Sequence, residues 1–546
     1  MANQVLKSGV AAIAPPQHVS VASRTRVNGW YARYVLGVLV LVYVINFIDR
    51  QILAILAEDI KADLGVSDAQ LGFLFGTAFA VFYATFGVAF GRLADVWNRK
   101  KLITVGLGFW SLMTVASGLT RSFLPLAFCR FGVGIGEASA TPAAFSMLYD
   151  YFSPKVRTTV LSIYSGGVYI GMGLGLFLGG SILEAWAAAW PHPAQAPFGL
   201  RGWQVAFMVV GLPGLIMALW VSTLREPVRG HTDGIISDNH PRPLGEMGVV
   251  LISMLPVANW VSFYRQSGQH NLAVSNAAAA TLIAVISLVL AELTGDILQW
   301  MALAVGVYAA VSWAQGLALR DPVVFGMMFR CRTLTTFIFA GASWTFTIVG
   351  IGFWAVPFFQ RYHNVSAGET GAILGLAMAT MGFVGIIVGG ILADRLRLYT
   401  PKGKLIVWLG SVSAALVSSL LFLTAQDVRL AYFGFFVLYL TGTMAHGPAV
   451  STVNDLMLPR GRATVSAFAF MISTFGGAAL GPYVTGHISD IIAVGGASSG
   501  EALRQAMLWT LLLPLTGILF VSRLLRHIAD DEESLITRAR ALGEKI

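Results

Sequence analysis

The sequence predicts an all-α polytopic membrane protein with two sets of six membrane-spanning helices, and three observations lead to this prediction. Apolar residues make up 56% of the 546-residue chain and charged residues only 12%, too few to cover a water-soluble protein of this length. Long apolar windows recur along the chain. A short loop motif occurs twice, once in each half. This composition excludes soluble enzymes, nucleic-acid-binding proteins and disordered proteins.

The apolar windows define the expected helices, because a helix needs about 20 apolar residues to cross roughly 30 Å of hydrocarbon. Six windows precede residue 225 and six follow residue 330, which predicts one bundle over 34–224 and a second over 334–524. In chain order the windows are 34–56, 70–90, 102–119, 123–150, 158–183, 203–223, 334–359, 369–393, 405–424, 430–450, 463–488 and 502–524.

The long connection between the two sets contains further apolar segments. We expect a cytoplasmic or interfacial linker over 225–275, in which the run 247–263 is at the short limit for a span. Two apolar runs within 276–319 predict an inserted transmembrane hairpin, followed by a connector over 320–333. The hairpin raises the expected number of spans to about fourteen without inverting the second set.

Basic residues predict the orientation of these spans. The net charge of +9 arises in short loops on one side of the predicted helices, as the positive-inside rule requires, so nucleic acid is not an expected partner. The tails 1–33 and 525–546 are therefore predicted to be cytoplasmic, in the cell (inner) membrane. The first tail lacks the apolar core of a signal peptide.

A duplicated loop motif relates the two halves. Gly91-Arg92-Leu93-Ala94-Asp95 follows the second predicted helix, and Gly390-Ile391-Leu392-Ala393-Asp394 follows the eighth, 299 positions later. The glycine would allow close helix approach, and the aspartate could accept hydrogen bonds from a facing helix N-terminus. We expect a conformational latch formed by Gly91, Asp95, Arg99, Lys100, Gly390, Asp394 and Arg395.

The duplicated loop resembles motif A of the major facilitator superfamily, in which a substrate cavity between two six-helix halves opens alternately to either side. The first copy has Asn98 where glycine is usual, and the second degenerates after Arg395. Residues 46–51, 67–72 and 130–139 resemble the spinster family, whose members move lysophospholipids or sphingosine phosphate. That resemblance is strongest over 34–225, and the inserted hairpin departs from it.

Four charged residues fall in the interior of predicted spans, more than five positions from either end, where charge is costly and usually functional. We expect Asp49 and Glu137 to bind and release protons and Arg50 and Arg130 to act as their charge partners. The alternative is a permanently paired cluster that only fixes the first and fourth helices. Arg50 could instead bind the anionic head of a substrate through its guanidinium group.

Several uncharged or weakly basic positions are candidates for a cavity or gate. Tyr164 and Tyr169 could line an apolar cavity, although core positions explain them equally well. The ladder Gly167, Gly171 and Gly175 could move during gating, with close helix packing as the simpler reading. His446 could bind protons or substrate, or be a hydrogen-bonded core histidine.

These features together favour a transporter over an enzyme or a channel. The sequence has no phosphate-binding loop of the G-x-x-x-x-G-K-[ST] kind, and its two cysteines form no metal-ligand pattern. We expect a monomeric, proton-coupled secondary transporter with no cofactor, embedded in membrane lipid. The spinster resemblance implies an amphiphilic anionic lipid substrate; the alternative is a symporter of small organic anions such as sugar acids.

Overall fold

The computed structural model describes residues 29–153, 156–230, 241–254, 260 and 270–544 of the chain. The expected N-terminal tail up to residue 28 and much of the run 247–263 lie outside the described residues. Helices are the regular elements of the described part, which confirms the all-α prediction.

The first bundle contains six helical rods, two of which are broken. The second rod divides at Gly76, where an added Cβ would lie 2.6 Å from the carbonyl oxygen of Ala479, so only glycine allows this approach of the other bundle. The expected single helix over 123–150 divides at Ala138 and Ser139. The elements are α2 (Gly29–Leu64), α3 (Asp68–Phe75), α4 (Thr77–Val96), α5 (Arg99–Ser117), α6 (Phe123–Glu137), α7 (Ala140–Tyr151), α8 (Arg157–Ala189), the short turns η2 (Pro193–Gln195) and η3 (Pro197–Gly199), and α9 (Gly202–Ser222).

The second bundle also contains six helical rods, but they do not all break at the same places. Its fourth rod divides at Ala445, and its fifth contains a π-helical turn, a feature that is common at functional sites. The elements are α15 (Arg332–Tyr362), α16 (Ala367–Arg397), α17 (Gly403–Thr424), α18 (Val428–Met444), α19 (His446–Asp455), η5 (Pro459–Gly461), α20 (Arg462–Ser473), η6 (Thr474–Ala479), α21 (Leu480–Val494), α22 (Ser499–Thr510) and α23 (Leu512–Leu524).

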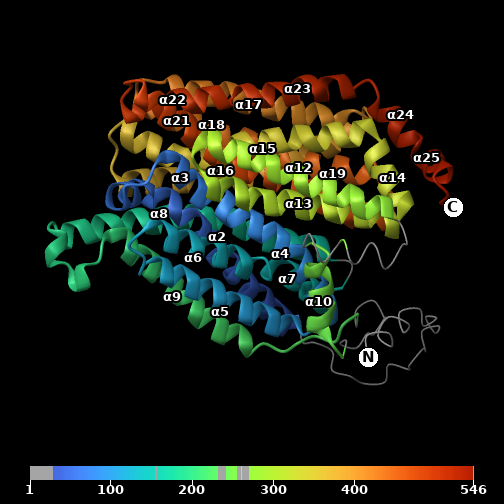
Figure 1. Cartoon of the computed structure of the whole chain (residues 1–546), viewed down its shortest axis with the longest axis horizontal. Coiled ribbons are helices and arrows are strands. Elements are labelled where there is room, and N and C mark those ends of the chain that lie inside the picture. Colours follow the sequence, from blue (N-terminus) through green and yellow to red (C-terminus); the bar gives the residue numbers. More distant parts are fainter. Residues whose placement is uncertain (1–28, 154–155, 231–240, 255–259, 261–269, 545–546) are drawn as a thin grey trace.

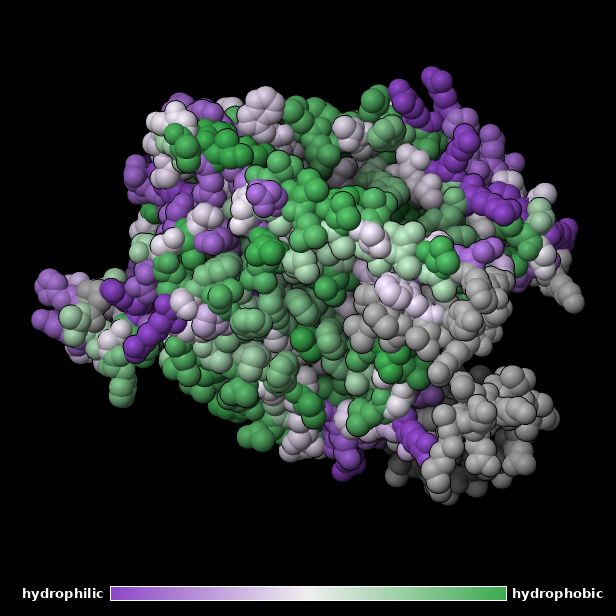
Figure 2. Space-filling view, in the orientation of Figure 1, coloured by the Kyte–Doolittle hydropathy of each residue, from purple (hydrophilic) through white to green (hydrophobic). Residues whose placement is uncertain are grey.

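The two bundles lie side by side with their helices roughly parallel to the long axis of the molecule (Figure 1). Apolar side chains cover the middle of the visible face, and hydrophilic side chains gather toward its two ends, as expected for a protein that crosses a membrane (Figure 2). Within the described residues, 12 helices are long and apolar enough to span a bilayer. The protein is therefore an integral multi-pass membrane protein.

The connection between the bundles is largely helical. It comprises α10 (Pro243–Ile252), α12 (His270–Thr294), α13 (Ile297–Arg320) and α14 (Pro322–Arg330). Both α12 and α13 are among the 12 long apolar helices, whereas α5 and the broken α6–α7 rod are not. The count of fourteen spans thus stays a prediction.

The hairpin α12–α13 packs where the two bundles meet. A Cβ on Gly306 would lie 2.9 Å from the Phe475 ring of η6 and 3.0 Å from Val81 of α4. At the hairpin tip, the hydroxyl of Tyr483 donates a hydrogen bond of 2.9 Å to Asp296. The hairpin therefore contacts both bundles.

The C-terminal residues form two short helices, α24 (Ile528–Glu533) and α25 (Leu535–Ala541), packed on the second bundle. Arg397 of α16 donates two hydrogen bonds to Glu532, of 2.8 and 2.5 Å. In Figure 1, α25 lies at the same end of the molecule as α10 and α14. We call this the Arg99 end, and the opposite end, which carries α3, the Asp68 end.

Candidate functional site

The four intramembrane charges meet between α2 and α6. Arg50 Nε donates to Glu137 Oε2 at 2.8 Å, and Arg130 Nη1 donates to the backbone oxygen of Asp49 at 3.3 Å. Asp49, Arg130 and Glu137 are buried, whereas the Arg50 side chain is 20% exposed. The structure thus joins the four residues that the sequence singled out, with Glu137 as the direct partner of Arg50.

Aromatic rings surround the Arg50 guanidinium group. Its Cζ atom lies 4.6 Å from the ring centre of Phe47 and 4.3 Å from those of Phe79 and Tyr83. Such cation–π contacts hold a guanidinium group in a largely apolar site. Tyr83 also contacts Phe470 of the second bundle, with ring centres 6.1 Å apart. Arg50 is therefore close to the boundary between the bundles.

Several polar atoms of the cluster have no hydrogen-bond partner among the described residues. They are both carboxylate oxygens of Asp49, Oε1 of Glu137, Nη2 of Arg50 and Nε of Arg130. Buried polar groups are nearly always paired, so each exception needs an explanation. A proton, a water molecule or the polar head of a ligand would supply the missing partners.

A second charged cluster closes the molecule at the Asp68 end. Arg361 of α15 makes two hydrogen bonds to Asp68 of α3, of 2.7 and 2.8 Å, and one of 2.8 Å to Glu58 of α2. Ser489 of α21 donates a further 2.8 Å bond to Asp68. Arg361 and Asp68 are both nearly buried. This cluster ties the two bundles together.

Two helix N-termini at the same end are capped across the boundary between the bundles. Asp490 of α21 accepts hydrogen bonds from the backbone amides of Asp68 and Ala69 at the start of α3, at 3.0 and 2.8 Å. Glu184 of α8 accepts from the hydroxyl of Ser366 and the amide of Gly368 at the start of α16, at 2.6 and 2.9 Å. In each case the carboxylate of one bundle meets the positive end of a helix from the other.

The two caps are related by the internal duplication. Gly72 and Gly371 are 299 positions apart, and so are Ala69 and Gly368; Glu184 and Asp490 are 306 positions apart. An added Cβ would meet the carbonyl oxygen of Pro482 at Gly72 and that of Leu176 at Gly371. We name Glu58, Asp68, Glu184, Arg361 and Asp490 the gate residues. Sequence reasoning missed them, although the repeated spacing is visible in the chain.

The first copy of the duplicated loop is organised around Arg99. Its buried side chain pairs with Asp150 of α7 and donates a 2.8 Å hydrogen bond to Glu226. The Lys100 amide donates to the same Glu226 carboxylate at 2.9 Å. The expected contact of Asp95 with a helix N-terminus is not present in the described residues: its carboxylate is exposed, and its backbone oxygen accepts from Arg229. The loop ties helices of the first bundle together.

The two loop glycines are not required for helix packing in this conformation. A Cβ on Gly91 or Gly390 would meet no atom within 4 Å, so neither glycine allows a close helix approach. In the second copy, Asp394 and Arg395 are exposed. The equivalent pair there is Lys404 with Asp455, each 305 positions after Arg99 and Asp150.

The glycine ladder of α8 packs against α2. A Cβ on Gly171 would lie 2.5 Å from the Val44 carbonyl oxygen, and one on Gly175 would lie 3.0 Å from that of Ile48; Gly167 has looser contacts of 3.4 Å and more. Close packing therefore explains Gly171 and Gly175. A different glycine, Gly173, meets Gly375 of α16, so the contact between α8 and α16 uses another face of α8.

The tyrosine candidates differ in their surroundings. Tyr164 is buried and stacks on Tyr43 of α2, with ring centres 4.3 Å apart, and its hydroxyl has no hydrogen-bond partner among the described residues. The ring of Tyr169 faces Gly382 of α16, so it belongs to the boundary between the bundles. A core position accounts for the ring of Tyr164.

His446 begins α19 at the break in its rod, and its side chain is exposed. It follows Gly442 by about one helical turn, and a Cβ on Gly442 would contact Trp344 and Ile348 of α15. The side chain is thus accessible although protein atoms surround it on most sides, and both roles expected of His446 stay predictions.

The described polar contacts between the two bundles show at which end of the molecule the bundles are joined. They extend from the gate residues to the hydrogen bond of 3.0 Å that the Thr77 hydroxyl donates to the Ala479 carbonyl oxygen. Thr77 is the first residue of α4, so these contacts lie in the half of the molecule toward the Asp68 end. The bundles are joined at the Asp68 end.

Comparisons with known proteins agree with this architecture. Residues 39–482 match the profile of the Major Facilitator Superfamily. An MFS-type efflux pump of Mycolicibacterium smegmatis is 28% identical over 470 residues, which cover 86% of this chain and 87% of the pump. The sphingosine-1-phosphate transporter SPNS2 of Mus musculus is 26% identical over 493 residues, covering 86% of this chain and 70% of that protein.

A solved structure shares the fold over nearly the whole chain. It is a bacterial homolog of the human lysosomal transporter spinster in an inward-facing, unoccupied conformation, with a TM-score of 0.69 and 25% identity, and the match covers 92% of this chain and 98% of that one. Proteins of this kind are transporters and not enzymes. The chain therefore belongs to the Major Facilitator Superfamily, and within that family it resembles the spinster proteins.

Proposed function

We propose that this transporter couples to protons and moves an amphiphilic anionic lipid, such as a lysophospholipid or a sphingosine-phosphate-like molecule, by alternating access. The observation that carries the proposal is the 2.8 Å pair of Arg50 and Glu137, a largely buried ion pair with unmade hydrogen bonds. The protein acts as a monomer in the cell membrane, with its Arg99 end and both termini in the cytoplasm.

In the proton step, the Glu137 carboxylate and the anionic head of the substrate compete for the Arg50 guanidinium group. A buried carboxylate is tolerated when a cation pairs with it, and it takes up a proton when that cation leaves. Protonation of Glu137 frees the Arg50 guanidinium group, which can then make bidentate hydrogen bonds to a phosphate or carboxylate head. Asp49 lies one residue before Arg50 and faces Arg130, so it provides the second proton-binding group.

Two features support an amphiphilic substrate. The rings of Phe47, Phe79 and Tyr83 around Arg50 would contact the apolar part of a substrate next to its charged head. The relatives include a protein named as a sphingosine-1-phosphate transporter. The gate residues support alternating access, because they close one end of the boundary between the bundles with contacts that can break.

The test uses purified protein in vesicles with an imposed pH gradient. Labelled lysophospholipids and sphingosine phosphate are compared with a sugar acid as substrates of the wild type and of Asp49→Asn, Arg50→Gln and Glu137→Gln. We expect saturable lipid flux that responds to the gradient in the wild type, and loss of that response in Glu137→Gln. Glu292→Gln, an exposed carboxylate on α12, is the matched control.

The outcomes separate the parts of the proposal. Full gradient-driven flux in both Asp49→Asn and Glu137→Gln would contradict proton coupling through these residues. Flux of the sugar acid alone would replace the lipid assignment with a small organic anion. Formation of a chemically altered product would contradict transport itself.

A further inference from the structure

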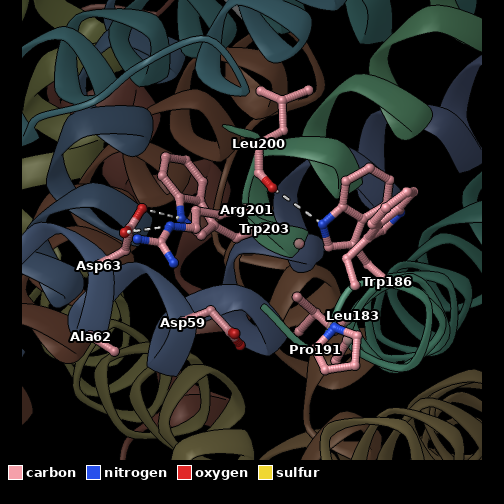
Figure 3. Close-up of a pocket in the computed structure, with 12 residues that line it drawn as sticks. Asp59, Ala62, Asp63, Leu183, Trp186, Pro191, Leu200, Arg201 and Trp203 are labelled. Carbon is pink, nitrogen blue, oxygen red and sulfur yellow. Dashed lines mark hydrogen bonds and ion pairs between the residues drawn. The ribbon is translucent and has the colours of Figure 1, made fainter. Parts of the chain in front are cut away.

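A pocket of about 310 Å³ opens at the Asp68 end of the first bundle, away from the Arg50 cluster. It is formed by the last turns of α2 and α8 and by the start of α9 (Figure 3). The charged and aromatic residues that line it are Asp59, Asp63, Trp186, Trp190, Arg201 and Trp203.

Three tryptophans line the pocket; Trp186 and Trp190 are accessible, whereas Trp203 is buried behind it. The indole nitrogen of Trp186 donates to the Leu200 carbonyl oxygen at 3.2 Å, and that of Trp203 donates to Asp63 at 3.0 Å. These bonds fix the two rings, and Trp190 lies with its ring centre 6.4 Å from that of Trp186. Fixed tryptophan faces attract organic cations, with which they make the strongest cation–π contacts.

Charges of both signs line the same pocket. Asp59 is exposed, and no hydrogen bond or ion pair joins its carboxylate to another of the described residues. Arg201 pairs with Asp63 at 3.0 Å, yet its side chain remains 46% exposed. The pocket therefore offers an acid and a guanidinium group beside aromatic rings, which suits a ligand that carries both charges.

The pocket is separate from the proposed transport site. Asp59 follows Arg50 by nine residues on α2, about 13 Å along the helix axis. The pocket lies at helix ends, and hydrophilic side chains gather toward the ends of the molecule (Figure 2), the level at which lipid head groups meet a membrane protein. A ligand with a lipid tail can reach this pocket from the membrane.

We infer that this pocket binds the head group of a zwitterionic phospholipid. The ammonium group lies between the Asp59 carboxylate and the faces of Trp186 and Trp190, and the phosphate accepts hydrogen bonds from Arg201. A membrane aromatic belt explains tryptophans at this level, but it does not explain an unpaired carboxylate inside the pocket.

The test uses full-length protein in nanodiscs with a phosphatidylcholine probe that carries a diazirine next to its head group. After photolysis, mass spectrometry maps the labelled peptides. We expect labels within 186–203 and 59–63. Short-chain phosphocholine should compete, whereas short-chain phosphoglycerol, which lacks the ammonium group, should compete about tenfold less well.

Matched variants keep the inference falsifiable. Asp59→Asn and Trp190→Leu should each weaken competition by phosphocholine about fivefold to tenfold. The controls are Glu292→Gln and Trp509→Leu, an exposed acid and an exposed tryptophan outside the pocket, which should leave it unchanged. Labels elsewhere, equal competition by phosphoglycerol, or unchanged binding in both pocket variants would overturn the inference. Competition by free inorganic phosphate or choline alone at the same concentration would also overturn it.

Discussion

Asp490 of the second bundle caps the first turn of α3 in the first bundle, accepting hydrogen bonds of 3.0 and 2.8 Å from the amides of Asp68 and Ala69. Glu184 repeats the arrangement in the opposite direction, from the first bundle to the start of α16. Helix caps normally join residues a few positions apart. Here each cap joins two bundles, so it breaks whenever the bundles separate at this end.

Removing the charge of either cap should loosen closure at the Asp68 end. In Asp490→Asn or Glu184→Gln, the loss of a charge at a helix N-terminus costs about 1 kcal/mol, which shifts the closed-to-open ratio roughly fivefold. The measurement is the rate at which a membrane-impermeant maleimide labels the thiol introduced by Phe75→Cys, in a background that also carries Cys129→Ser and Cys331→Ser.

The control for this prediction is Asp427→Asn. Asp427 caps α18 within the second bundle, through a bond of 2.8 Å from the Arg429 amide, so its loss should not change the labelling rate. Equal rates in wild type, Asp490→Asn and Glu184→Gln would show that these carboxylates do not hold the bundles together.

Arg361 should contribute more than either cap. Its removal in Arg361→Gln leaves the buried Asp68 with Lys61 as its remaining cationic partner, so the cost should approach but not reach the roughly 3–5 kcal/mol of an unpaired buried charge. We expect a lower unfolding temperature in scanning fluorimetry, and partial recovery in the double variant Arg361→Gln/Asp68→Asn, because that variant also removes the buried charge.

A more exposed pair serves as the comparison. Arg504→Gln removes an ion pair with Glu501 within α22, and such pairs contribute about 0–1 kcal/mol. A double variant as unstable as Arg361→Gln itself would mean that packing of the arginine side chain, and not its charge, stabilises the gate.

Two glycine-to-alanine substitutions should change the free energy of unfolding in opposite directions. Gly171→Ala places a methyl group 2.7 Å from Cβ of Phe47, so we expect a loss of about 1–3 kcal/mol from overpacking. Gly410→Ala adds a methyl group that meets no atom within 4 Å, and alanine favours the helix by about 1 kcal/mol. Thermal unfolding of both variants checks the prediction, and destabilisation by Gly410→Ala would contradict it.

The membrane fold was predictable because its signal is local. Twelve apolar windows of about 20 residues are enough to place twelve helical rods, and some of these extend their windows at both ends, as α2 does over Gly29–Leu64. The breaks at Gly76 and Ala445 were not predictable. They depend on contacts with other helices, such as the approach of the Ala479 carbonyl oxygen to Gly76.

The part of the site that was predictable consists of charged residues in segments where charge is rare. A charge inside an apolar window is conspicuous, so Asp49, Arg50, Arg130 and Glu137 stood out, and α2 and α6 bring them together. The gate residues lie near the ends of helices, where charge is ordinary. Nothing in the local sequence pairs Arg361 with Asp68, which is 293 positions away.

Acid should release the C-terminal helix. Arg460 pairs with both Asp321 and Glu544 and so ties α25 to the loop before α14. Burial opposes the shift, but hydrogen bonds from Arg460 and the Val324 amide hold the pKa of Asp321 below its ordinary value. A lowered carboxyl pKa contributes stability above the ordinary value of about 3.9, and this contribution is lost as the pH falls through the lowered pKa.

We therefore expect protection of the α25 amides in hydrogen exchange, corrected for the intrinsic rate, to be constant from neutral pH to about pH 5 and to fall below about pH 4. Arg460→Gln should lower the protection at neutral pH by up to about fivefold and remove most of its pH dependence, because it takes the partner from Asp321 and Glu544 together. Asp321→Asn should weaken the pH dependence, whereas Glu292→Gln should retain it. Protection that persists unchanged at low pH in the wild type would mean that apolar contacts such as Leu542 with Gly326 hold α25 without the ion pairs.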